Sequence, residues 1–375
     1  MIVHSYVVYP LWMIMFPATK STAKETYTKV DELPDVAILM AAYNEEKVIA
    51  EKIESVFNTT YPLDKIKFYI GSDASTDKTD EIIRKWQAKY PQIELVVFGG
   101  RTGKSGIINE LSDKATQEIF ILTDANVIFK PDTIFNLVRH FKDSITAQVC
   151  ANIIKVSPTN NGIASQEKSY IALENKIKYQ ESVRWNLVMG AEGGCYAIRK
   201  SAFSKVPPKF YMDDFYITLN VIEQQKEIVF DLDAICNEDV PTQALEEFKR
   251  KVRISIGNFQ NLNRYKGLLS SSPKGIAYAF LSHKIFRWIT PFLLLICFMT
   301  SYPLMFHYPI FKYIFLLQLL GFVTPVTDWL FNIKFSPLKF ISHFYLMNLA
   351  LLKGFVIYVK GVESNVWQPT KREVN

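Results

Sequence analysis

Two adjacent carboxylates, Asp213 and Asp214, stand at the start of an apolar-periodic segment, FYMDDFYITLNVI (residues 210–222). A helix cap explains one acidic residue at a helix start, but it does not explain two. Adjacent carboxylates repel each other unless a cation or a proton-transfer task accounts for them, and the repulsion raises the pKa of one. A carboxylate with a raised pKa can act as a general base. The pair therefore predicts proton abstraction, with helix capping as the alternative for one member.

Another carboxylate interrupts an apolar stretch, FILTDANVIFKPD (residues 120–132), which stops at Asp124 and resumes at Val127. Polar residues also follow two earlier apolar runs, at Tyr43-Asn44-Glu45 and at Asp73. Asp and Asn after a strand often cap the next helix or set a turn. Taken singly, Asp73 and Asp124 fit such a role and a ligand-binding role equally well.

Lys104 lies in GGRTGKSG (residues 99–106), which looks like a phosphate-binding loop. The pattern G-x-x-x-x-G-K-[ST] requires glycine at position 98, where this sequence has Phe98. We therefore exclude an ATPase of that type. Lys104 begins a predicted helix whose free N–H groups could meet an anionic ligand, and the alternative is a solvated lysine at a helix start.

A cluster of basic residues lies on a predicted amphipathic helix, ALEEFKRKVRISIGNFQNLNRY (residues 244–265). Two interpretations have equal weight. The positive face either rests on a membrane surface, or Arg253 points into the binding crevice and neutralises a leaving group. The cluster comprises Lys249, Arg250, Lys251 and Arg253.

The segments around these residues alternate between two periodicities. Apolar runs typical of strands cover residues 36–40, 67–70, 95–98 and 118–122. Helical patterns cover residues 45–57, 77–90, 104–115 and 131–141. This alternation predicts an α/β domain with a parallel sheet and helices on both faces. Ligands bind at the carboxyl ends of such strands, which is where Tyr43, Asp73 and Asp124 stand.

The composition indicates a membrane protein. Of the 375 residues, 49% are hydrophobic, which is high for a soluble enzyme of this size. The net charge of +6 suits an anionic membrane surface. Nucleic acid is not indicated as a partner, because no basic stripe is interleaved with aromatic residues. The four cysteines are widely spaced in apolar surroundings, so they predict neither a zinc site nor a disulfide framework.

Three apolar stretches each approach the roughly 20 residues that a membrane-spanning helix needs, and they cover residues 281–302, 310–331 and 340–359. Lys334 and Lys339 lie between the second and third stretches, whereas residues 301–308 contain no Lys or Arg. The positive-inside rule then places residues 332–340, and everything before 280, in the cytoplasm. Buried helices of a soluble core are the alternative. Residues 1–18 predict a short uncleaved membrane anchor, with an interfacial helix as its alternative.

An ordered set of motifs resembles a known family. Between residues 36 and 254 the sequence contains VAILMAAYNEE, GSDASTDKT, GKSGIINE, LTDAN, GAEGGCYAIRKSAF, DDF and RKVRI. Their order and spacing closely resemble the membrane-associated family 2 glycosyltransferases with the GT-A fold, the group that contains cellulose, chitin and hyaluronan synthases and makers of bacterial exopolysaccharide. HKIFRW (residues 283–288) resembles the interfacial element that precedes the spans of these enzymes.

The resemblance implies a GT-A (Rossmann-like) α/β catalytic domain with a mainly parallel sheet, followed by interface and transmembrane helices. The expected divisions are a membrane anchor at 1–18, the GT-A domain at 35–235, amphipathic interface helices at 236–280, three transmembrane helices at 281–360 and a tail at 361–375.

The resemblance also implies site residues. Asp214 matches the general base of the family, with Asp213 beside it and Arg253 assisting the leaving group. Asp124 and Asn126 match the Asp-x-Asp element that holds a divalent cation, Mg²⁺ or Mn²⁺. The remaining nucleotide-sugar positions match Ala42, Tyr43, Glu45, Asp73, Lys104, Arg250 and Lys251, together with Asp124.

Three positions depart from the family pattern. Asn126 replaces the second aspartate, which keeps an oxygen ligand but removes a charge. Ile254 replaces a tryptophan of the acceptor site in processive relatives, and Arg250 replaces a glutamine. These departures leave both chain extension and single addition open.

The resulting hypothesis is an inverting glycosyltransferase that moves a hexosyl or N-acetylhexosaminyl group. Its donor would be a nucleotide-diphosphate sugar, expected to be a UDP-sugar, and its acceptor a glycan or a lipid-linked carrier. The expected location is the cytoplasmic face of the inner (plasma) membrane, in contact with lipid and with room for an export partner subunit. The alternative is a catalytically weak nucleotide-binding subunit that regulates or scaffolds a polysaccharide export complex.

Overall fold

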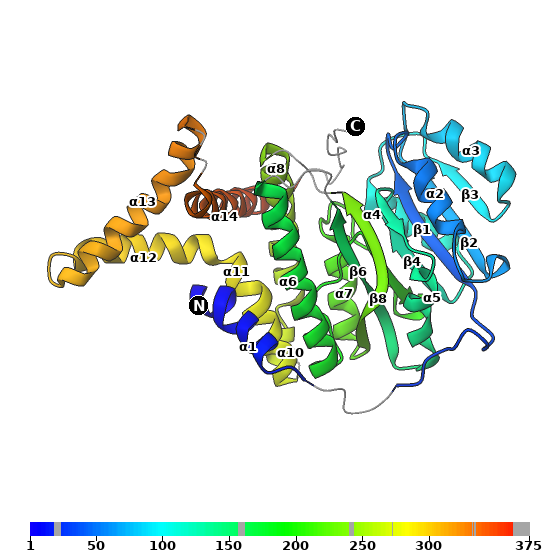
Figure 1. The fold of residues 1–375 in the computed structure, drawn as a ribbon, viewed down its shortest axis with the longest axis horizontal. Helices are drawn as coiled ribbons and strands as arrows, with labels where there is room; N and C mark the ends of the chain where they lie inside the picture. Colours follow the sequence, from blue (N-terminus) through cyan, green and yellow to red (C-terminus); the bar gives the residue numbers. More distant parts are fainter. Residues whose placement is uncertain are drawn as a thin grey trace.

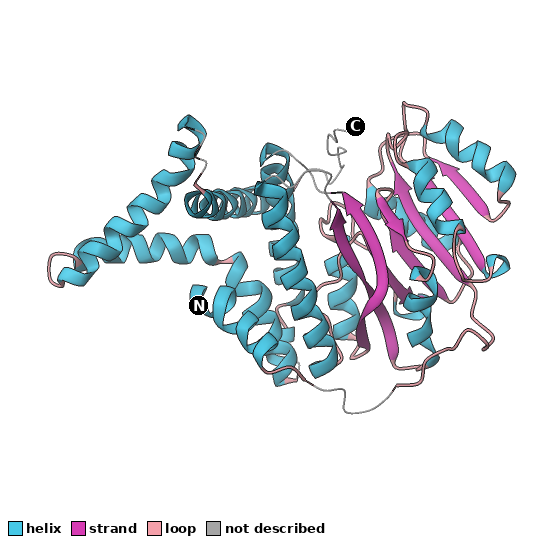
Figure 2. Cartoon of the chain, in the orientation of Figure 1, coloured by secondary structure: helices cyan, strands magenta, loops and turns pink. Residues whose placement is uncertain are grey.

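The computed structural model describes residues 1–18, 24–156, 162–239, 244–271, 273–331, 333 and 335–362. A strand-rich domain lies at one side and an arm made only of helices at the other (Figure 2). The strands form one eight-stranded sheet in the order β3-β2-β1-β4-β7-β6-β8-β5. Their bounds are β1 Val36–Ala42, β2 Ile66–Ser72, β3 Ile93–Val97, β4 Ile119–Thr123, β5 Val127–Phe129, β6 Thr146–Val156, β7 Cys195–Arg199 and β8 Glu227–Asp239.

The four strands predicted from the sequence are β1 to β4, and they are mutually parallel. The other half of the sheet is more mixed than predicted. Strand β7 runs antiparallel to both β4 and β6, and β5 runs antiparallel to β8, whereas β6 and β8 are parallel. The α/β prediction is confirmed, with a sheet that is only partly parallel.

Helices cover both faces of the sheet, as predicted (Figure 1). Along β1, Val36, Ile38 and Met40 belong to one buried cluster, and Ala37 and Leu39 belong to the other. The alternation follows from the two-residue period of a strand. The helices of this domain are α2 Ile49–Phe57, α3 Thr79–Lys89, α4 Lys104–Lys114, α5 Thr133–Val138, α6 Gly162–Trp185 and α7 Asp213–Glu223, with short 3₁₀ turns at Leu63–Lys65, Arg139–Lys142 and Lys200–Ala202.

The helix predicted to begin at residue 45 begins at Ile49. Asn44 adopts a left-handed backbone (φ 53°), and its side-chain oxygen accepts a hydrogen bond from the Thr76 backbone N–H at 2.8 Å. These residues therefore form a turn between strand ends, which agrees with the turn-forming tendency of Asn.

The helices that follow β8 include an arm that extends away from the sheet (Figure 1). Two of them are long and apolar enough to cross a membrane, Pro309–Phe331 and Pro337–Lys360. The first predicted span instead falls on two helices, Gly275–Trp288 and Thr290–Leu304, which meet at a 63° bend. These two helices provide a third span only if together they cross the membrane once. Lys334 and residues 363–375 lie outside the described part. The bounds are α8 Ala244–Tyr265, α9 Leu268–Ser271, α10 Lys274–Ala279, η5 Phe280–Ile285, α11 Phe286–Trp288, α12 Thr290–Leu304, α13 Pro309–Phe331 and α14 Ser336–Lys360.

The N-terminal helical segment, η1 (His4–Val8) and α1 (Tyr9–Met15), packs against α6. Tyr9 and Met13 are fully buried there beside Ile177. Outward-facing residues of the same segment, including Leu11, Met15 and Phe16, are exposed. One face of the predicted anchor therefore packs on protein and the opposite face is apolar.

Helix α8 joins the sheet domain to the apolar arm, because it packs along α14. The closest approach is at Gly354, where an added Cβ would lie 2.6 Å from the backbone oxygen of Val252 and would overlap the side chain of Ser255. The Ser255 hydroxyl donates to the Leu351 carbonyl at 2.7 Å. The absent side chain at Gly354 thus permits two backbones to touch.

We expect Gly354→Leu to separate α8 from α14, because Leu favours a helix but cannot fit against backbone atoms. Overpacking of this kind typically costs about 1–3 kcal/mol, which corresponds to a melting temperature lower by several degrees. Thermal melting of the detergent-solubilised protein measures it. Gly267→Ala is the control, because nothing lies close to an added Cβ at that position. Equal melting temperatures for both variants would show that this contact is not close-packed.

Candidate active site

The acidic residues of the sequence analysis meet at the carboxyl end of β4. Lys104 Nζ lies 2.6 Å from Asp124 Oδ1 and 3.9 Å from Asp213 Oδ2. It also donates to the Gly193 carbonyl at 3.3 Å. Burial by itself would lower the pKa of Lys104, but Asp124 and Asp213 outweigh that effect and raise it. One ammonium group therefore joins two carboxylates that are far apart in the sequence.

Asp213 and Asp214 begin α7, as predicted, directly after Met212 in a left-handed conformation (φ 58°). Asp214 accepts a hydrogen bond from the Phe215 backbone N–H at 2.8 Å, so a local capping contact is present. Burial and the adjacent Asp213 carboxylate raise the pKa of Asp214 to about 7. Asp214 can thus hold or release a proton near neutral pH, as a general base must.

The backbone opposite Asp214 is unusually close. A Cβ added to Gly193 would lie 2.9 Å from Asp214 Oδ2, so a larger residue would displace the carboxylate. The next carbonyl, of Gly194, accepts from the Asp124 N–H at 3.1 Å and from the Thr123 hydroxyl at 3.0 Å. The glycines of GAEGGCYAIRKSAF thereby let this loop contact both acidic elements.

Asn126 has a partner that the sequence did not indicate. Its side-chain nitrogen donates to Glu238 Oε1 at 3.3 Å, and Glu238 Oε2 lies 2.7 Å from Lys155 Nζ. Lys155 and Glu238 are opposite each other in the β6–β8 register. The carboxylate missing from position 126 is thus present nearby on another strand, already paired with a buried lysine.

Arg253 faces the same site from α8. Burial and the neighbouring Arg250 lower the pKa of Arg253, while the charges of Asp124 and Asp213 oppose this shift. Arg250 acts electrostatically on Glu192. Of the two predicted orientations of the basic cluster, these interactions favour the crevice for Arg250 and Arg253.

The predicted nucleoside residues gather at the ends of β1 and β2. Asp73 is buried and accepts hydrogen bonds from the backbone N–H groups of Thr102 and Gly103 at 2.5 Å and 3.2 Å. Arg101 Nε donates to Asp73 at 3.0 Å, and its guanidinium lies 3.3 Å from the Tyr43 ring centroid. Asp73 therefore shapes the loop that leads into Lys104. Glu45 and Ala42, which accepts from the Asp73 N–H, are buried at the same edge.

Lys52 was missed in the sequence analysis. Its ammonium is fully buried, donates to Thr123 Oγ1 at 2.8 Å and to the Val127 carbonyl at 2.5 Å, and lies 3.6 Å from the Phe129 ring centroid. Burial lowers its pKa to about 8. Lys52 thus supports both sides of the turn that carries Asp124. The sequence feature that could have revealed it is a lysine on the apolar face of a predicted amphipathic helix.

The donor atoms at this turn suit a hard cation. Asp124 offers a carboxylate and Asn126 an amide oxygen, which are ligand types that Mg²⁺ and Mn²⁺ prefer. The Lys104 ammonium at 2.6 Å shows that Asp124 is open to a positive charge. Within the described ranges, no group of three or more His, Cys, Asp and Glu side chains forms a metal site. A cation held by these two side chains would therefore take its remaining ligands from other groups, such as water.

The comparisons identify the domain. A sequence profile of glycosyl transferase family 2 matches residues 37–206. The chain contains a glycosyl transferase family 2 domain. Its fold is also that of the mannosyltransferase PcManGT from Pyrobaculum calidifontis, solved in complex with GDP-Man and Mn²⁺, with a TM-score of 0.72 and 18% identity over 96% of both chains. The predicted GT-A fold is thereby confirmed.

The curated relatives are polysaccharide and glycolipid enzymes. The chain is 25% identical over 238 residues to the probable glycosyltransferase YdaM of Bacillus subtilis, covering 60% of this chain and 56% of the relative. It is 23% identical to the beta-monoglucosyldiacylglycerol synthase of Synechocystis sp. (64% and 51% covered) and 24% identical to the poly-beta-1,6-N-acetyl-D-glucosamine synthase of Staphylococcus epidermidis (62% and 57% covered). The chain spans about half the length of these relatives, and its family 2 domain is related in sequence to both kinds of synthase.

The Lys104 ion pairs predict a pH-dependent loss of stability in Lys104→Met. Lys104 opposes the effects of burial and Asp213 on the pKa of Asp214, so its removal should raise that pKa further above 7. A carboxyl whose folded pKa exceeds its unfolded value loses stability as the pH rises between the two. The variant should therefore keep losing melting temperature, relative to wild type, as the pH rises above about 7.

Lys85→Met is the matched control, because Lys85 also makes a 2.6 Å contact with a carboxylate, that of Glu81, but on an exposed helix face. Solvent and salt screen an exposed pair, so this pair contributes little to stability and little change with pH is expected. The same pH dependence in both variants would contradict the cluster described for Lys104.

Proposed function

We propose that this protein is an inverting glycosyltransferase that moves a sugar from a UDP-sugar to a glycan or lipid-linked acceptor at the cytoplasmic membrane face. The sugar would be a hexosyl or N-acetylhexosaminyl group. The observation that carries this proposal is the Asp214 carboxylate, whose pKa of about 7 arises from burial and from Asp213. A base tuned to neutral pH is what deprotonation of an acceptor hydroxyl requires.

The charges opposite the base suit a departing diphosphate. Lys104 lies beside Asp124 and Asp213, and Arg253 interacts electrostatically with the same two carboxylates. Cations fixed in this position stabilise the negative charge that develops as the nucleotide leaves. With Asp214 as the only proposed base and no proposed nucleophile beside the anomeric carbon, direct displacement inverts the configuration at that carbon.

Asp124 and Asn126 would hold the divalent cation, which, when bound, neutralises charge on the diphosphate. Tyr43, Glu45 and Asp73, at the neighbouring strand ends, would hold the nucleoside, and Arg250 and Lys251 would contact the diphosphate from α8. These assignments agree with the observed clustering of the strand ends and with the electrostatic contacts of α8.

The acceptor would approach from the membrane side. Helix α8 carries Arg253 and packs on α14, one of the two helices long and apolar enough to span a bilayer. An acceptor with a lipid anchor could thus be presented to Asp214 at the interface. The relatives named above make both polymers and glycolipids, so the proposal includes glycan and lipid acceptors alike.

The decisive experiment is release of UDP by membranes that contain the protein, across a panel of UDP-sugars with Mg²⁺ or Mn²⁺. We expect one donor to turn over, and Asp214→Asn to reduce kcat by about 100-fold or more, because general-base catalysis contributes 10²- to 10⁴-fold. Asp113→Asn, which alters an exposed aspartate paired with Lys205, is the control and should retain activity. UDP binding without turnover of any donor would instead favour the nucleotide-binding scaffold.

The Asn126–Glu238 contact yields a separate prediction about the metal. Asn126→Asp would place a second carboxylate against Glu238, and like charges at hydrogen-bond distance repel each other. We therefore expect this variant to bind Mn²⁺ no better than wild type. The double variant Asn126→Asp with Glu238→Gln should bind Mn²⁺ about tenfold more tightly than Asn126→Asp, an energy difference of about 1.4 kcal/mol.

Electron paramagnetic resonance titration of Mn²⁺, with and without UDP, measures this directly. Glu238→Gln alone shows whether loss of the Lys155 ion pair disturbs the site. Tighter Mn²⁺ binding by the single variant Asn126→Asp would contradict the influence assigned to Glu238.

A further inference from the structure

The loop between α6 and β7, residues 187–194, forms one wall of the candidate site. Its Gly193 carbonyl accepts from Lys104, and its Gly193 backbone leaves room only for a hydrogen beside Asp214. Gly190 (φ 100°) approaches the ring of Phe215, the residue after Asp214, where an added Cβ would lie 2.6 Å from the ring. The position of this loop therefore decides where Lys104 and Asp214 lie.

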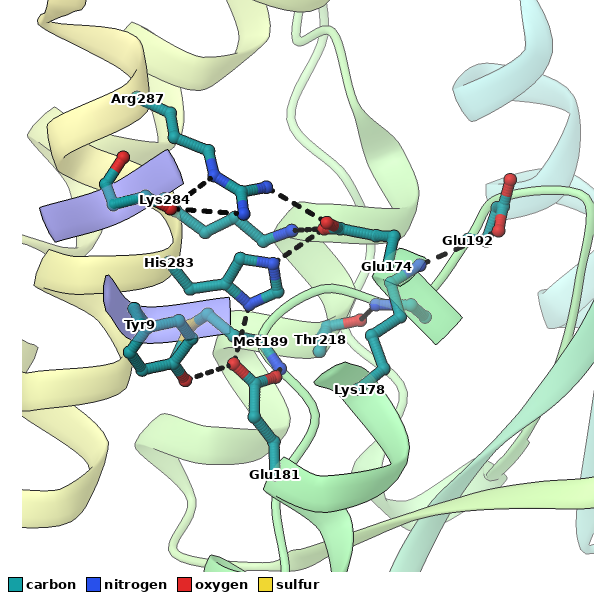
Figure 3. Close-up of polar contacts among 12 residues, drawn as sticks. Tyr9, Glu174, Lys178, Glu181, Met189, Glu192, Thr218, His283, Lys284 and Arg287 are labelled. Carbon is teal, nitrogen blue, oxygen red and sulfur yellow. Dashed lines mark hydrogen bonds and ion pairs between the residues drawn. The ribbon is translucent and has the colours of Figure 1, made fainter. Parts of the chain in front are cut away.

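Buried polar side chains hold the loop from behind (Figure 3). Glu181 Oε2 accepts from the Met189 N–H at 2.9 Å. Thr218 Oγ1 accepts from the Ala191 N–H at 3.2 Å, and Lys178 Nζ lies 3.6 Å from Glu192 Oε2. Three residues of the loop are thus attached to α6 or α7: Met189, Ala191 and Glu192.

Helix α6 carries three buried charged side chains on one face. Glu174, Lys178 and Glu181 are separated by four and three residues, which places them in one row along the helix. All three are buried, with 8%, 5% and 0% of their surfaces exposed. Burial alone would raise the pKa of Glu181, but His283, Lys284 and the Met189 N–H outweigh burial and lower it. The row is therefore a set of buried charges.

The same row also contacts η5 and α11, next to the apolar arm. His283 is fully buried, with Nδ1 2.6 Å from Glu181 Oε1 and Nε2 2.7 Å from Glu174 Oε1. Each ring nitrogen of His283 thus lies within hydrogen-bond distance of a different carboxylate. Lys284 and Arg287 also reach Glu174, at 2.8 Å and 2.9 Å (Figure 3). The Tyr9 hydroxyl donates to Glu181 at 2.7 Å, which adds α1 to the network.

Stability alone does not account for such a network. Replacing buried ion pairs with apolar side chains of similar volume is often neutral or stabilising. Buried charges do, however, demand partners at defined places, because a misplaced partner leaves a desolvated charge uncompensated. A network of this kind therefore fixes positions more than it adds free energy.

We propose that Lys178 and Glu181 are positioning residues for sugar transfer, which hold the 187–194 loop against Lys104 and Asp214, and that His283 connects them to the interfacial segment beside the membrane helices. The inference rests on the proposed role of Asp214. In this proposal the network acts through the loop. When η5 and α11 contact α6, α6 holds the 187–194 loop in the position that Asp214 and Lys104 require.

The test compares Lys178→Met, Lys178→Arg and the control Lys176→Met in the full chain in detergent and lipid. Lys178→Met keeps the length of the side chain and removes its charge, and Lys178→Arg restores the charge. Lys176 lies on the exposed side of the same helix, two residues away. Kinetics with the donor found above and hydrogen exchange of the 187–194 peptide are both measured, at a temperature where every variant is folded.

We expect Lys178→Met to lower kcat by about 10- to 100-fold while the donor KM changes less than about threefold, because misplacement of catalytic groups acts on the chemical step. Lys178→Arg should recover most of this loss, and Lys176→Met should match wild type. In Lys178→Met the 187–194 peptide should also exchange faster. Glu181→Gln, which retains an acceptor for Met189 but removes the charge facing His283, should shift both readouts in the same direction.

A lower melting temperature for Lys178→Met with unchanged kcat and unchanged exchange of the loop would overturn the proposal and leave a merely structural role. Because kinetics and hydrogen exchange are both measured, failure of this proposal can be distinguished from failure of the proposed function. If no UDP-sugar turns over in wild type, the proposed function fails, but loop exchange still tests whether Lys178 and Glu181 hold this loop.

Discussion

Like charge gathered at one edge of the sheet is the constraint on which this structure depends. Asp124 follows β4 and Asp213 and Asp214 begin α7, so the fold brings three carboxylates to one site. Such a group is costly to bury unless cations accompany it. Lys104 supplies one cation within 2.6 Å of Asp124, and Arg253 faces the same carboxylates from α8. Burial and the Asp213 carboxylate still raise the pKa of Asp214 to about 7, which suits the role of general base proposed for it.

The same demand for charge balance connects the site to the rest of the chain. Arg253 of α8 interacts electrostatically with Asp124 and Asp213, and Val252 and Ser255 of the same helix contact Gly354 of α14. On the opposite flank, the buried row on α6 links the 187–194 loop to His283, close to the bend that precedes α12. Two elements of the apolar arm thus contact helices that bear site residues. If the proposed positioning role of α6 holds, docking of the arm and the geometry of the site are coupled.

Support beneath the acidic turn comes from a different source. Lys52 places a buried ammonium between Thr123 and Val127, and Glu238 and Lys155 fix the Asn126 amide from the far half of the sheet. Both contacts use charged side chains inside the domain. They explain how a turn with one aspartate and one asparagine keeps a defined shape, since each end is attached to a different element.

The sequence by itself determined the local elements and the chemical types at the site. Strands β1 to β4 and helix α4 were predictable because their side-chain periodicity is local, and the Asp213–Asp214 pair was conspicuous because its members are adjacent. The antiparallel strand β7, the bend before α12, and the pairs Lys178–Glu192, Lys155–Glu238 and Lys104–Asp124 came only from the tertiary structure. Periodicity records which face of an element is buried, but it carries no information about which distant charge will be buried against it.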